Sequence, residues 1–134
     1  MDSNLFTACE EGDLIKVQSL CKQNNPNPIY LDYNHAFCLA CHFGHLKVAQ
    51  WLYSQKNIDL HHDDKSAFNG ACLRNHLEVA EWIYSLGEID STAKLQKEDI
   101  CFAIKGAQIL QHRNIVYWLT SLLIKGLTGQ KEKK

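Results

Sequence analysis

Two short segments of the chain bring together side chains that can bind metal ions or transfer protons. Cys38 and Cys41 lie three positions apart and are followed by His42 and His45, while the segment from His61 to Asp64 adds two histidines and two aspartates. Thiolates and imidazoles are the usual ligands of zinc, which normally takes four of them in a tetrahedron. A zinc site would therefore need both segments, and the same histidines would be the candidates for acid-base chemistry.

The recurrence of these residue types along the chain favours a structural role instead. Cysteine occupies one position of an internal repeat and histidine another, at Cys9, Cys41 and Cys72 and at His45, His76 and His112. A small side chain that recurs with the fold is most simply a core residue, and histidines spread along a chain do not converge on one substrate. We therefore predict no metal site, no redox pair and no catalytic histidine. The segment from His61 to Asp64 is expected to be a solvated loop, with partner contact as the alternative.

The internal repeat is defined by alanine and tryptophan. Three copies share the same spacing, in which the first alanine precedes its tryptophan by fifteen positions: Ala36, Ala40 and Trp51; Ala67, Ala71 and Trp82; Ala103, Ala107 and Trp118. Apolar residues three and four positions apart predict two short helices per copy. Gly44, Asn75 and Gln111 stand between them, where a left-handed residue would end the first helix, although Gln111 fits this conformation at a cost of about 1 kcal/mol.

A fainter copy opens the chain, and it carries Lys16 and Ser19 where the others carry apolar residues and tryptophan. Such polar substitutions are typical of a terminal cap in a repeat array. We predict an all-α solenoid of about four helix-turn-helix repeats, at residues 4–33, 34–64, 65–100 and 101–126. They form one domain, 1–126, followed by a basic flexible tail at 127–134.

The copies resemble ankyrin repeats. Residues 40–52 and 75–87 are similar to the second half of the family's repeat, and Gly12-Asp13-Leu14 resembles its N-terminal caps. The Trp-Leu-Tyr-Ser and Trp-Ile-Tyr-Ser endings most resemble the divergent repeats of giant DNA viruses and amoebae. The Thr-Pro-Leu-His of the family is replaced, and repeat lengths of 32, 31 and 36 are irregular. The fingers between repeats are therefore expected to be short or irregular, and whether they form β-hairpins stays open.

Composition bounds the function. The chain has 134 residues, of which 46% are hydrophobic, and a formal net charge of −1, which gives no electrostatic footprint for nucleic acid or an anionic membrane. No charged-then-apolar leader, long apolar stretch, phosphate-binding loop or nucleophile motif is present. We predict a cytoplasmic protein, in the host-cell cytoplasm if viral, with no cofactor and no enzymatic activity.

Function is expected where the copies differ. The two positions after the second small residue change from acidic to apolar along the chain, and in ankyrin proteins the matching positions line a concave binding face. We expect that face to bind a protein partner, with contacts from the loop between repeats, through His42, Phe43, Leu73, Arg74, Ile109, Leu110, Asp63 and Lys65. For Ile109 and Leu110, burial under a neighbouring connection is the open alternative.

The last copy carries apolar residues with no further unit to cover them. Val116, Trp118 and Leu119 are retained, and Leu122, Leu123 and Ile124 are added. Either the last helix caps the end or this face pairs with another chain, so the alternative function is a structural, self-assembling protein. We favour a monomer, and we place the three tryptophans in the shared core.

Overall fold

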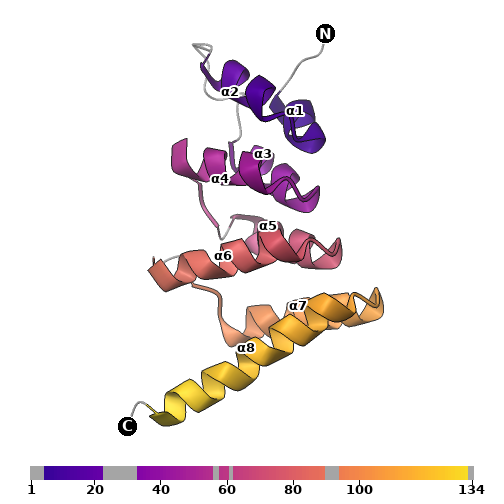
Figure 1. Ribbon diagram of the computed structural model, residues 1–134, viewed down its shortest axis with the longest axis vertical. Coiled ribbons are helices and arrows are strands. Elements are labelled where there is room, and N and C mark those ends of the chain that lie inside the picture. Colours follow the sequence, from indigo (N-terminus) through magenta and orange to yellow (C-terminus); the bar gives the residue numbers. More distant parts are fainter. Residues whose placement is uncertain (1–4, 23–32, 56–57, 61, 90–93, 133–134) are drawn as a thin grey trace.

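The computed structural model describes residues 5–22, 33–55, 58–60, 62–89 and 94–132. These residues form helices and no strand, arranged as successive helix pairs stacked in chain order (Figure 1). The helices are α1 (Leu5–Glu11), α2 (Leu14–Lys22), α3 (Tyr33–His42), α4 (Leu46–Gln55), α5 (His62–Leu73), α6 (Leu77–Ile89), α7 (Lys97–Ile109) and α8 (Arg113–Glu132). The predicted all-α solenoid of helix pairs is confirmed.

Within each pair, a single left-handed residue reverses the chain. The amide of Gly44 donates to the carbonyl of Cys41 at 3.1 Å, and the amide of His45 donates to the carbonyl of Ala40 at 2.8 Å. These two bonds satisfy the last carbonyls of α3, and the same pattern follows α1, α5 and α7. The turn residues have positive φ, at 74° for Gly12, 78° for Gly44, 64° for Asn75 and 63° for Gln111.

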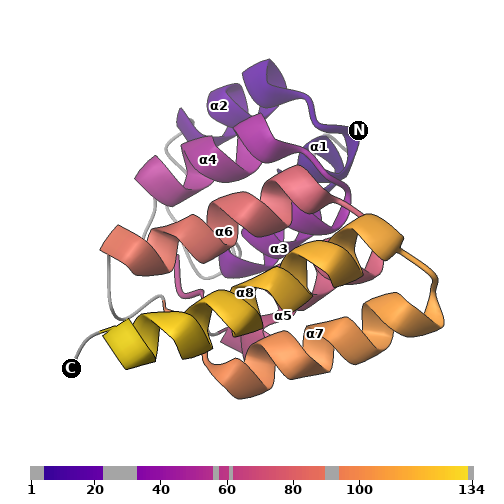
Figure 2. The same cartoon turned by 60° about the horizontal axis from the view of Figure 1, so that its bottom comes forward.

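One hydrophobic core runs through the stack. The first helices of the pairs form one layer and the second helices another, as the turned view shows (Figure 2). The repeated small residues are buried in this core: Cys9, Ala36, Ala40, Cys41, Ala67, Ala71, Cys72, Ala103 and Ala107. Their predicted burial is confirmed, and small side chains at such positions let helices approach closely.

Trp82 and Trp118 join neighbouring pairs rather than filling the centre of the core. All three tryptophans are half-buried and pack against the buried cluster. The ring centroid of Trp82 lies 6.0 Å from that of Phe37 and 5.7 Å from that of Tyr53, both in the preceding pair. Trp118 contacts Phe68 and Tyr84 in the same way, at 6.4 Å and 6.0 Å. The expected core position is therefore corrected to a junction between repeats.

Two segments differ from what the sequence suggests. Residues 62–64, expected in a loop, form the first turn of α5, and His61 lies outside the described residues. Helix α8 continues to Glu132, into the segment expected to be a flexible tail. Both helices extend further from the turn than the repeat pattern does, which is why the pattern did not indicate them. The predicted fingers fall mostly in 23–32, 56–57, 61 and 90–93, outside the described residues.

Candidate functional site

The recurring histidines hold adjacent repeats together. Nε2 of His45 lies 2.9 Å from the carbonyl oxygen of Glu10, and Nε2 of His112 lies 2.8 Å from that of Leu73. A carbonyl only accepts, so Nε2 donates the hydrogen in both bonds. His76 bonds the backbone of His42 in the same manner. The expected contact with a turn therefore exists, but the turn belongs to the preceding repeat. The bonded carbonyl lies 35 positions before His45 and 39 positions before His112.

Glycine in the turn makes room for these rings. A Cβ atom added to Gly12 would collide with the ring of His45, and one added to Gly44 would collide with the ring of His76. Burial lowers the pKa of His76 below the ordinary 6.5, with further lowering by His45 and Arg74 and an opposing effect of the bond to His42. The ring of His76 is therefore a neutral donor at neutral pH.

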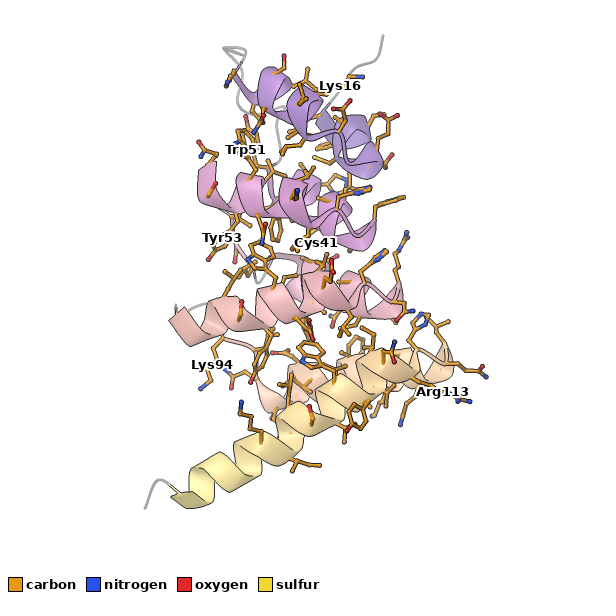
Figure 3. The ribbon with its side chains drawn as sticks, in the orientation of Figure 1. Lys16, Cys41, Trp51, Tyr53, Lys94 and Arg113 are labelled. Carbon is orange, nitrogen blue, oxygen red and sulfur yellow. The ribbon has the colours of Figure 1, made fainter. Side chains whose placement is uncertain are left out.

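The recurring cysteines are enclosed by the stack. Cys41 is fully buried in the stack (Figure 3). Burial raises the pKa of Cys9 and of Cys72 to about 12, and it raises that of Cys41 as well. In the part of the chain that the structure describes, no group of three or more His, Cys, Asp and Glu side chains is arranged to hold a metal ion. The thiols therefore act as small apolar side chains.

The candidate binding residues lie at the tips of the helix pairs. Phe43 is 40% exposed, and the guanidinium carbon of Arg74 lies 5.1 Å from the centre of its ring. This cation–π contact connects the second and third repeats at the surface. Leu73 is 38% exposed and extends across Gly106, where an added Cβ would meet its side chain. Phe43, Leu73 and Arg74 thus form one continuous patch.

His42 has a different environment from its neighbours. Its Nε2 donates to the carbonyl oxygen of Ser66 at 2.9 Å, and its ring covers Gly70, where no Cβ would fit. The ring is part-buried, so only part of it lies at the surface. His42 and Leu73 occupy equivalent positions, and each reaches over a glycine of the next repeat.

Ile109 and Leu110 continue the series at the last turn. They are 79% and 50% exposed, respectively, so the alternative that they lie beneath a neighbouring connection does not hold. Asp63 and Lys65 lie in the first turn of α5, but their side chains fall outside the described part of the structure. The candidate residues that can be placed therefore follow the tips of three successive repeats.

Several exposed apolar residues did not enter the sequence prediction. Tyr117 is 81% exposed, and Phe102 on α7 and Ile15 on α2 are also exposed. The signal for Tyr117 is present in the repeat itself, because this tyrosine stands where the preceding copies carry the polar Gln50 and Glu81. A comparison of exposed positions between copies would have found it.

A stack of helix pairs with an invariant core and variable tips is an α-solenoid repeat protein. A family model described as ankyrin repeats, in three copies, matches residues 5–94. The chain belongs to the ankyrin-repeat family. The fourth pair, α7 and α8, lies beyond the matched residues and has the same turn geometry. No curated protein and no solved structure matches the chain.

Membership in this family bears on activity and partners. Ankyrin repeats are generally protein-protein interaction modules, and the family is typically non-enzymatic. Over the described residues, no helix has the length and hydropathy needed to cross a membrane. Protein recognition is therefore the general role of the family to which this stack belongs.

Proposed function

We propose that this protein binds another protein through its tip patch, defined as His42, Phe43, Leu73, Arg74, Ile109 and Leu110, on the concave face of the stack. The observation that supports this proposal most directly is the exposure of large apolar side chains at equivalent positions of successive repeats. Apolar surface of this kind on a soluble protein is typical of an interaction site. Asp63 and Lys65, from the start of α5, complete the proposed contact set.

The mechanism is the display of side chains on a rigid support. Arg74 is already held over Phe43, and Leu73 is supported by Gly106, so binding orders few new groups. Interfaces whose side chains are ordered in advance lose less conformational entropy on association. Aromatic and arginine side chains also contribute most of the binding energy in typical interfaces. Phe43 and Arg74 are therefore the proposed centre of the patch.

The cellular setting is part of the same proposal. We infer a cytoplasmic monomer that binds neither nucleic acid nor membrane, because the net charge is −1 and none of the six cysteines is in a disulfide bond. The Trp-Leu-Tyr-Ser and Trp-Ile-Tyr-Ser endings support a viral or amoebal source, and a viral protein of this kind would act in the cytoplasm of its host.

Replacing Phe43 by Asp and Arg74 by Ala tests the tip patch. The double variant removes both partners of the cation–π contact between Arg74 and Phe43, so neither is left without the other. The free energy of unfolding is therefore expected to change by less than about 1 kcal/mol. Binding to a partner isolated from cell lysate and then purified is expected to weaken by at least about tenfold. Calorimetric titration of the purified pair measures this change.

Ile15→Asp is the matched control, because Ile15 is an exposed apolar residue on α2, outside the patch. It is expected to leave the affinity unchanged. Equal affinities of the wild type and the double variant would contradict the proposed site, and a large loss of stability in the double variant would place Phe43 in the core.

A further inference from the structure

The last helix pair has an open side that the internal pairs do not have. On α3, Cys38 and Cys41 are buried. The same positions on α7 hold Lys105 and Gln108, and both are exposed. The stack therefore ends at α7 and α8 in a face with exposed polar side chains, and no further helix pair covers this face in the described structure (Figure 2).

This end is hollowed. A hollow of about 490 Å³ lies beside the turn between α7 and α8, and it is lined by Gln108, Gln111, Arg113, Val116, Tyr117 and Thr120. Thr120 stands two residues after Trp118. Tyr53 and Tyr84 occupy the same position in the two preceding repeats, and each contacts the tryptophan of the following pair. Threonine is much smaller than tyrosine, so the hollow has room for a large side chain at the place where the internal junctions receive an indole.

The charge of this end is mainly positive. A second hollow of about 420 Å³ lies along α7, lined by Lys97, Glu98, Cys101, Phe102 and Lys105. Together the two hollows are lined by three cationic side chains and one carboxylate, and Arg113 projects at the edge of the end (Figure 3). Opposite charge on a partner would be attracted here, and the same charge would be repelled.

The charge and the hollow also argue against a second copy of this chain as the occupant. Two copies joined through the same end would bring Lys97, Lys105 and Arg113 against their equivalents. Joining the open end to the first repeat of another copy would place Ser19 where the internal junctions have tryptophan. The first arrangement therefore lacks negative charge. The second brings the acidic Glu10 and Glu11 of the first repeat but lacks a tryptophan at the junction position.

We propose that the terminal face, defined as Lys97, Lys105, Gln108, Arg113, Tyr117 and Thr120, binds an acidic amphipathic helix of another protein, which inserts an aromatic side chain beside Thr120. This surface is separate from the tip patch, and its occupation does not depend on that of the patch. The internal junctions provide the pattern, because there a helix places an indole against the preceding pair.

A peptide with the sequence of α6 provides a defined probe. This sequence carries Trp82, which fills the equivalent position two junctions earlier, and exposed Glu78 and Glu81. Because a helix of this length is marginal in water, the peptide is held helical by a side-chain staple. Its dissociation constant from the full chain is measured by fluorescence anisotropy. One control peptide has Trp82→Ala, and another has Glu78→Lys with Glu81→Lys.

The proposal requires that the α6 peptide bind with a dissociation constant below about 1 mM, and that each control peptide bind at least about tenfold more weakly. In the protein, Lys105→Glu with Tyr117→Asp is expected to weaken binding of the α6 peptide by at least about tenfold. Both side chains of this variant are exposed, and its thermal unfolding serves as a check of folding. Phe43→Asp is expected to leave peptide binding unchanged.

Three outcomes would overturn the proposal. The first is a dissociation constant of the α6 peptide above about 1 mM. The second is equal affinity of the protein for the α6 peptide and its two control peptides. The third is loss of peptide binding in Phe43→Asp with retention in the terminal-face variant. Sedimentation adds a fourth: concentration-dependent dimers that Tyr117→Asp converts to monomers would identify a second copy as the occupant. None of these results affects the tip patch, which is tested with a different partner.

Discussion

At the scale of single residues, the recurring histidines contribute through hydrogen bonds between repeats. Each recurring imidazole donates to a carbonyl of the preceding repeat and lies over a turn where glycine or asparagine takes positive φ. The recurrence of the histidine indicated a structural role from the sequence alone. The carbonyl partner could not be predicted, because it lies more than thirty positions away and is brought close only by stacking.

The lowered pKa of His76 makes stability depend on pH. The unfolded chain, with a pKa near the ordinary 6.5, binds a proton more readily than the folded chain. The free energy of unfolding therefore contains a contribution that is fully present above that value and is lost as the pH falls through the lower folded pKa. Between about pH 7.5 and about pH 5, the wild type is expected to lose more stability than His76→Gln.

Urea unfolding followed by tryptophan fluorescence measures both proteins across this range. A wild-type profile that runs parallel to that of His76→Gln would show that this imidazole has the same proton affinity in the folded and unfolded chains.

At the scale of the helix pair, the sequence allows most of the architecture to be predicted. The spacing of alanine, cysteine and tryptophan predicts both helices and their buried face, because the same residue types recur at the same spacing in each copy. The tip patch could be located only by comparing variable positions. Its details depend on contacts between repeats: Leu73 extends over Gly106, His42 is partly withdrawn onto Gly70, and Arg74 lies on Phe43.

Because the turn residues have positive φ, two substitutions at these positions are expected to have opposite effects on stability. Gln111 has φ of 63°, so Gln111→Gly relieves unfavourable backbone conformation and is expected to stabilise the protein by about 0.5–1 kcal/mol. Gly44 has φ of 78°, and a Cβ there collides with His76, so Gly44→Ala is expected to destabilise by about 1–3 kcal/mol. Urea denaturation gives both values. Effects of the same sign would contradict this account of the turn.

At the scale of the whole molecule, stability depends on the junctions between pairs. Phe37, Tyr53 and Trp82 form one junction, and Phe68, Tyr84 and Trp118 form the next. In a stack where each unit contacts only its neighbours, an internal junction supports the units on both sides. This is why the tryptophans recur although they are only half-buried.

Trp82→Ala is expected to lower the free energy of unfolding by about 3 kcal/mol, near the lower end for such truncations because the ring is partly exposed. Unfolding followed by circular dichroism and by fluorescence of the remaining tryptophans should give coincident transitions. A normal melting temperature with lost partner binding would instead make Trp82 a recognition residue.

The identical junctions have a genetic consequence. Each recurring histidine finds its carbonyl in the unit just before, and Trp82 and Trp118 find their aromatic partners there. A tandem duplication of one internal unit would therefore create a new boundary already equipped with these contacts. Unequal recombination within the coding sequence would thus lengthen the molecule without requiring compensating mutations. Chain length in such a lineage is free to vary by whole units while each boundary is inherited intact.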